Sequence, residues 1–154
     1  MKTEIHNLQE KFLEEIDIIE KSTFKDPWSK MAYAGEILNE SAYYKVITVE
    51  NEVVAYGGFH KIFDEAHITN IAVKESFRGK GFGRMLMEEL IEEAKELQIV
   101  SMTLEVRVSN NRAVTLYEKM GFIKVGTRKN FYRDPIENAS IMTKRFDTDE
   151  NFSN

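Results

Sequence analysis

Apolar and polar positions alternate along the chain with two different periods, which divides it into helices and strands. Apolar residues three or four positions apart indicate amphipathic helices, and we predict them over residues 8–21, 29–39, about 84–98 and 110–120. Period-two alternation, or a run of β-branched and aromatic residues, indicates a strand. We predict strands over residues 43–50, 53–63, 66–73, 101–108, 122–132 and 140–146, with a further candidate near residues 3–7.

Several of these elements end at residues with suitable local chemistry. Ser29 and Asn110 are good N-cap residues, because their side-chain oxygens can accept hydrogen bonds from the first turn of a helix. Gly121 stands at a C′ position, where a left-handed backbone conformation ends a helix. The order of helices and strands predicts an α/β fold in which helices cover a mixed sheet.

Length and composition fit one globular domain. The 154 residues, 42% of them hydrophobic and 31% charged, can fill a single core. We expect that domain to cover residues 1–146, followed by a disordered polar tail over residues 147–154. No apolar stretch is long enough to cross a membrane, and residues 1–7 lack the apolar run of a secretory signal. We therefore expect a cytoplasmic protein without membrane association.

The residue inventory excludes several kinds of chemistry. There is no cysteine, which rules out a cysteine nucleophile, a thiolate metal site and disulfides. The histidines His6, His60 and His67 do not have the spacing of a zinc-binding helix, so we expect no metal. The net charge of −5 argues against direct nucleic-acid binding.

A glycine-rich segment, RGKGFGR at residues 78–84, joins the strand that ends at Val73 to the next helix. Glycines let the backbone approach a ligand closely, and the first N–H groups of a helix are unpaired and carry a partial positive charge. The segment therefore predicts a phosphate site. A Walker loop would need Ser or Thr after Gly79-Lys80, and a dinucleotide loop would need Gly in place of Leu86. A turn that only starts a helix is the alternative.

A second candidate region follows in the sequence LEVRVSN, which contains Glu105 and Asn110, and in AVTLYEKMGF, which contains Tyr117. Periodicity alone makes Glu105 an exposed strand residue and Tyr117 a core aromatic residue. Asn110 is explained by its capping role alone. These interpretations stay open without a wider motif.

The pattern Arg78-x-x-Gly81-x-Gly83, with the strand before it and the motif after it, resembles the GNAT superfamily of acetyltransferases. Residues 70–142 are similar to its ribosomal-protein-alanine acetyltransferase subfamily, and the PWS sequence at residues 27–29 adds to the likeness. The resemblance implies a GNAT fold, an α/β architecture with a mixed, mostly antiparallel central sheet that is flanked by helices and splayed to admit acetyl-CoA.

The same resemblance assigns roles to individual residues. It implies that Glu105 is the general base and that Tyr117 is the general acid. It implies that acetyl-CoA, the co-substrate, is bound by Ile71, Ala72, Val73, Arg78, Gly79, Lys80, Gly81, Phe82, Gly83, Arg84 and Asn110.

The implied reaction is acetyl transfer to a protein N-terminal α-amine, with the N-terminal alanine of a small-subunit ribosomal protein as acceptor. Asn138-Ala139-Ser140 stands where an acidic residue is common in the subfamily. A lysine side chain, a polyamine or another small amine therefore remains an alternative acceptor. A coenzyme A-binding sensor without catalysis is the alternative of another class.

Overall fold

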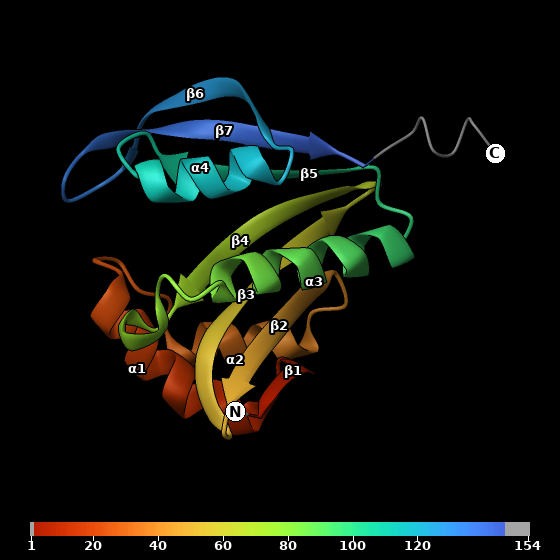
Figure 1. The fold of residues 1–154 in the computed structure, drawn as a ribbon, viewed down its shortest axis with the longest axis vertical. Helices are drawn as coiled ribbons and strands as arrows, with labels where there is room; N and C mark the ends of the chain where they lie inside the picture. Colours follow the sequence, from red (N-terminus) through yellow and green to blue (C-terminus); the bar gives the residue numbers. More distant parts are fainter. Residues whose placement is uncertain (1, 147–154) are drawn as a thin grey trace.

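The computed structural model describes residues 2–146, which form a seven-stranded sheet with helices on both faces (Figure 1). The strands are β1 (Thr3–Asn7), β2 (Ala42–Val49), β3 (Glu52–Ile62), β4 (Glu65–Val73), β5 (Ser101–Arg107), β6 (Ile123–Tyr132) and β7 (Glu137–Arg145). The helices are α1 (Leu13–Thr23), α2 (Lys30–Leu38), α3 (Phe82–Glu96) and α4 (Asn111–Lys119), with short 3-10 turns η1 (Glu10–Phe12) and η2 (Glu75–Phe77).

The strand order is β1-β2-β3-β4-β5-β7-β6. Only β4 and β5 run parallel, and the other neighbouring pairs are antiparallel. The predicted mixed, mostly antiparallel sheet flanked by helices is thus confirmed. The prediction for residues 147–154 lies outside the described residues.

The parallel pair is short and opens into a fork. β4 and β5 are paired only at Glu65↔Ser101, Ala66↔Met102 and His67↔Thr103. Beyond these pairs β4 continues beside β3, whereas β5 continues beside β7. Figure 1 shows the two halves of the sheet diverging from this point. The fork leaves one edge of β4 without a partner strand over its second half.

Two hydrophobic cores lie on opposite faces of the sheet. One is covered by α3 and α4 and includes Leu86, Leu90 and Tyr117. The other is covered by α1 and α2 and includes Ile16 and Tyr33. Because successive strand residues point to opposite faces, β4 contributes to both cores.

The predicted local signals at the ends of the helices are confirmed. The Ser29 side chain accepts a hydrogen bond from the Ala32 N–H at 3.0 Å and caps α2. Asn110 caps α4 in the same way through the Ala113 N–H at 3.2 Å. Gly121 has a φ of +97°, as expected for the residue that ends α4.

Two predicted boundaries were wrong because long-range contacts decide them. α1 begins at Leu13 instead of residue 8, since the Leu8 N–H still donates to the Tyr44 carbonyl at the sheet edge. β7 begins at Glu137 instead of residue 140. Glu137 pairs with Tyr132 on β6, and its carboxylate accepts from Arg107 at 3.0 Å. No helix among residues 2–146 is both long enough and apolar enough to cross a bilayer.

Packing between β2 and β3 leaves no room for a side chain at Gly58, where an added Cβ would lie 2.4 Å from the Tyr44 ring. We expect Gly58→Ala to lower the free energy of unfolding by about 1–3 kcal/mol through overpacking. Gly35 in α2 is the matched control, because no atom lies within 4 Å of its added Cβ. Gly35→Ala should stabilise the protein by about 0.4–1 kcal/mol. Urea unfolding of both variants measures these changes. Equal changes in the free energy of unfolding would contradict the tight packing at Gly58.

Candidate active site

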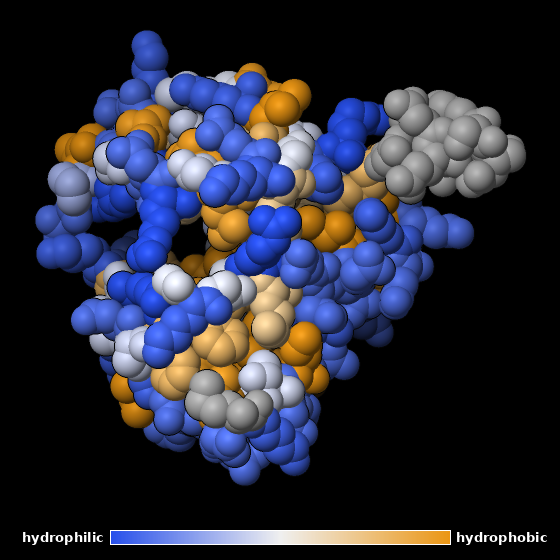
Figure 2. Space-filling view, in the orientation of Figure 1, coloured by the Kyte–Doolittle hydropathy of each residue, from blue (hydrophilic) through white to orange (hydrophobic). Residues whose placement is uncertain are grey.

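The predicted site residues lie along the two arms of the fork and at its mouth. Glu105 is on the β5 arm, two residues beyond the last pair that β4 and β5 share. The β4 arm, from Ile68 to Val73, is roughly 17 Å long at about 3.3 Å per residue. Figure 2 shows the surface hollowed between the part that carries α4, β6 and β7 and the part below it, with a largely hydrophilic rim. The fork can therefore hold an extended ligand.

The loop after β4 forms an anion cradle. Gly79 and Gly81 have φ values of +76° and +89°, a conformation that favours glycine. Gly81 is the N-cap of α3 and makes no side-chain cap, and the first helical bond is from the Met85 N–H to the Gly81 carbonyl at 3.0 Å. The N–H groups of the first turn therefore lack helical acceptors. Open space surrounds the position of an added Cβ on Gly81, so the cradle fits the pyrophosphate of acetyl-CoA.

Some side chains of this loop have structural roles instead of ligand-facing ones. Arg78 donates from Nε to the Val73 carbonyl at 2.9 Å and so closes the loop onto the end of β4. Phe82 is buried and packs edge-on against Phe77, with ring centroids 5.9 Å apart. Phe82 can therefore meet a ligand only through its backbone.

Two basic side chains of the cradle are engaged at its surface. Lys80 places Nζ 5.4 Å from the Phe77 ring centroid. Arg84 lies 3.3 Å from the Glu88 carboxylate, one helical turn further along α3. Both are exposed and can turn toward an anion at little cost, because exposed ion pairs are weak.

Arg112, in the first turn of α4, also reaches the cradle, and sequence reasoning missed it. A guanidinium nitrogen of Arg112 lies 2.8 Å from where a Cβ on Gly79 would stand. The absence of a side chain at Gly79 thus lets a cation from the other arm of the fork meet the loop. No local signal marks Arg112, because 33 residues separate it from Gly79.

Glu105 is half-buried, faces the same side of β5 as Arg107, and pairs with Ile141 on β7. The nearby hydroxyl of Tyr132 has its pKa raised to about 12, first by burial and then by the charge of Glu105. The Arg107 guanidinium lies over the Tyr132 ring, 4.5 Å from its centroid. Tyr132 thus lies beside the predicted base.

Tyr117 is 8% exposed and packs against Phe122, with ring centroids 5.8 Å apart. Burial raises the pKa of its hydroxyl to about 12. The Tyr117 hydroxyl makes no hydrogen bond within residues 2–146. Since every fully buried polar side-chain atom in these residues has a hydrogen-bond partner, the Tyr117 hydroxyl must be accessible to solvent. Tyr117 also contributes to the raised pKa of Tyr132. Glu105 and Tyr117 therefore both lie near Tyr132.

The remaining predicted contacts are placed as follows. Ile71 and Val73 pack against the core under α3, and Ala72 is buried on the opposite face. These residues can therefore offer a ligand their backbone along the free edge of β4. Gly83 packs in the first turn of α3 near Leu116 and Val73, at 3.7 and 3.8 Å from its added Cβ. The Asn110 oxygen caps α4, which leaves its side-chain nitrogen for a ligand.

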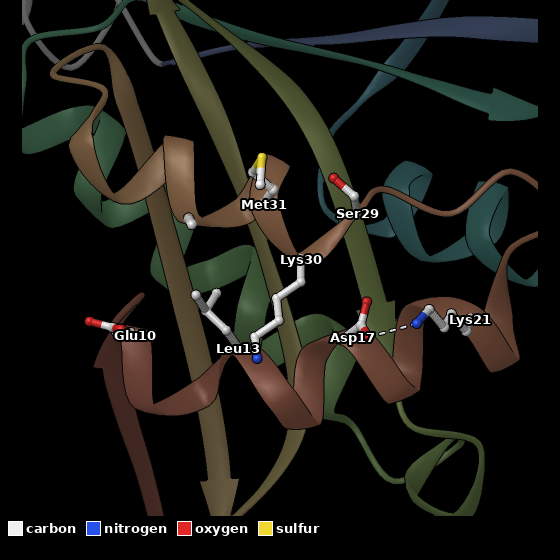
Figure 3. A pocket seen from close by; sticks show the side chains of 8 residues that line it. Glu10, Leu13, Asp17, Lys21, Ser29, Lys30 and Met31 are labelled. Carbon is white, nitrogen blue, oxygen red and sulfur yellow. Dashed lines mark hydrogen bonds and ion pairs between the residues drawn. The ribbon is translucent and has the colours of Figure 1, made fainter.

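A second recess of about 650 Å³ lies between α1 and α2, away from the fork (Figure 3). Its lining includes the ion pair of the half-buried Asp17 with the exposed Lys21, with 2.8 Å between carboxylate and ammonium. None of the predicted site residues lines it. Across residues 2–146, no three His, Asp or Glu side chains gather in a way that could hold a metal ion.

Comparisons with known proteins agree with this geometry. The family model described as "Acetyltransferase (GNAT) family" matches residues 3–122. A Bacillus subtilis (strain 168) protein with the provisional name ribosomal protein bS18-alanine N-acetyltransferase is 39% identical over 92% of this chain and 94% of its own length. The Escherichia coli K12 protein of that name is 35% identical over 80% of this chain and 84% of its own. The crystal structure of the E. coli ribosomal-protein-S18-alanine N-acetyltransferase superposes with a TM-score of 0.86, at 32% identity and 94% coverage of both chains.

The raised pKa of Tyr117 makes stability depend on pH. Between pH 10 and 12 the unfolded chain loses tyrosine protons that the folded protein keeps, so stability present below pH 10 is lost as the pH rises toward 12. The expected loss is about 1.4 kcal/mol per pH unit for each such tyrosine. Tyr117→Phe should make this decline shallower. Urea unfolding at several pH values from 9 to 11.5 measures it, and a decline unchanged by the substitution would contradict the raised pKa of Tyr117.

Proposed function

The chain belongs to the acetyltransferase (GNAT) family, and we propose that it transfers acetyl from acetyl-CoA to the N-terminal alanine of a ribosomal protein of the bS18 type. The observation that supports this acceptor is the similarity to bS18-alanine N-acetyltransferases over nearly the whole chain. In this proposal the reaction takes place in the fork. The phosphate cradle lies at its open end, and Glu105 lies near the point where β4 and β5 part. We propose a cytoplasmic location on the same basis.

In the proposed reaction Glu105 takes a proton from the α-ammonium of the acceptor, directly or through a water. The freed nitrogen attacks the thioester carbonyl carbon, and N–H groups along the free edge of β4 can stabilise the oxyanion. The C–S bond then breaks. Tyr117 donates its proton to the departing sulfur, and the second proton of the acceptor nitrogen restores the tyrosine. Glu105 then releases its proton to water, so the products are the acetylated peptide, coenzyme A and one proton.

The acceptor is tested with two peptides in an assay of coenzyme A release from acetyl-CoA. One peptide carries the free N-terminal sequence of the ribosomal protein. The other has the same sequence with a blocked α-amine and an internal lysine. We expect turnover of the first peptide only, because the reaction needs the α-amine. Turnover of the lysine peptide, or of a polyamine but neither peptide, would overturn the proposed acceptor.

The catalytic assignments are tested with Glu105→Gln and Tyr117→Phe. Each should lower kcat by about 10²–10⁴-fold, the usual contribution of a general acid or base. Glu118→Gln is the matched control, because it makes the same chemical change at an exposed position next to Tyr117 on α4. It should leave kcat unchanged. Full activity in the Glu105 or Tyr117 variant would remove that residue from the mechanism.

A further inference from the structure

The β4 strand contains a bulge directly after its last pair with β5. Gly58 on β3 pairs with Asn70, but the next residue, Phe59, pairs with Ile68. Thr69 is therefore an extra residue in β4, placed where the fork opens. A bulge breaks the regular ladder and turns the backbone groups of the strand to new directions. The backbone that faces the reacting end of a ligand in the fork is thus irregular and needs support.

Asn70, in this bulge, is held by a buried carboxylate from α1. Its side-chain nitrogen donates to Oε1 of Glu20 at 2.5 Å and to the Tyr33 hydroxyl at 2.6 Å. Glu20 is only 1% exposed, and its Oε1 also accepts from the hydroxyls of Tyr33 at 2.6 Å and Tyr56 at 2.9 Å. Its Oε2 accepts from the Trp28 N–H at 2.9 Å. One carboxylate therefore joins α1, the segment before α2, β3 and the bulge.

Thr69 is held in a similar way by a second carboxylate, from α2. Its hydroxyl lies 2.6 Å from the Tyr44 hydroxyl, which lies 3.1 Å from Oε1 of Glu36. His60 on β3 places Nε2 2.6 Å from the same oxygen of Glu36. Both side chains at the bulge are thus anchored to the helical layer behind the sheet, on the face opposite α3.

Position along β4 relates this support to the candidate site. The cradle lies just beyond Val73, and the bulge lies about 13 Å back along the strand, at about 3.3 Å per residue. Glu105 lies at the same level on the other arm of the fork. A ligand whose phosphates occupy the cradle would run along the free edge of β4, with its far end beside Thr69 and Asn70.

Burying a carboxylate is costly unless strong donors satisfy it, and all four contacts of Glu20 are with N–H or O–H groups. Such contacts depend on direction, so they fix Asn70 more narrowly than apolar packing would. We propose that Glu20 is a positioning residue that acts through Asn70 to hold the β4 bulge in the shape that binds the acetyl end of acetyl-CoA. The proposal rests on the proposed function only in taking acetyl-CoA as the ligand of the fork.

The test compares Asn70→Ala with Tyr56→Phe. Each substitution removes one donor from Glu20, but only Asn70→Ala releases the bulge. We expect Asn70→Ala to raise the calorimetric Kd and the KM for acetyl-CoA about tenfold, or about 1.4 kcal/mol, with a smaller effect on kcat. Tyr56→Phe should lower the Tm about as much as Asn70→Ala does. It should leave the Kd and KM for acetyl-CoA within about twofold of the wild-type values, which is under 0.5 kcal/mol. Equal Kd values for the two variants would overturn the proposal.

A charge exchange provides a second test that does not depend on Asn70→Ala folding well. Asn70→Asp places a second carboxylate against Glu20 and should weaken acetyl-CoA binding at least as strongly as Asn70→Ala. Adding Glu20→Gln to the Asn70→Asp variant places an amide donor opposite the new carboxylate. The double variant should recover part of the affinity for acetyl-CoA. A double variant no better than Asn70→Asp would overturn the direct role of Glu20.

These outcomes are separate from those of the proposed function. Binding of acetyl-CoA is measured without an acceptor, so a wild-type protein that acetylates no peptide still gives a clear answer on Glu20. A wild-type protein that fails to bind acetyl-CoA would overturn both proposals together.

Discussion

The structure depends on the shortness of the parallel pairing between β4 and β5. Three residue pairs hold the two strands together, and beyond them each strand follows a different neighbour. A continuous ladder would satisfy every backbone group of β4 and leave no room in the middle of the sheet. By parting, the strands give one arm free backbone groups and give the other arm Glu105. The helices on the two faces then keep both arms in place, since α3 and α4 share one core across the opening.

Much of this arrangement could be predicted from local patterns. The capping side chains of Ser29 and Asn110 and the left-handed Gly121 act within a few residues, and the sequence located each of them. The glycine-rich loop likewise carries its own chemistry, because positive φ values and a helix N-terminus are properties of consecutive residues. The roles of Glu105 and Tyr117 came from resemblance, since periodicity alone describes a strand glutamate and a core tyrosine.

The features that the sequence did not reveal all depend on contacts between distant segments. Glu20 looks like a surface residue in α1, yet partners 13, 36 and 50 residues away bury it. The start of β7 follows from the pairing of Glu137 with Tyr132 and from its contact with Arg107. Arg112 meets Gly79 only because the fork brings α4 over the loop. Charged residues have no periodic signature when their partners lie in other elements.

The protonation of the two site tyrosines has a consequence for selectivity. Because Tyr117 and Tyr132 stay neutral to about pH 12, neither changes charge over the physiological range, and the acceptor amine is the group that titrates there. An α-amine with a pKa near 7.8 is uncharged in about one molecule in seven at pH 7, whereas a lysine near 10.4 is uncharged in roughly one in 2,500. That ratio, roughly three hundredfold, favours chain termini before any contact with the protein is made. A site of this kind can discriminate by the acidity of its substrate as well as by shape.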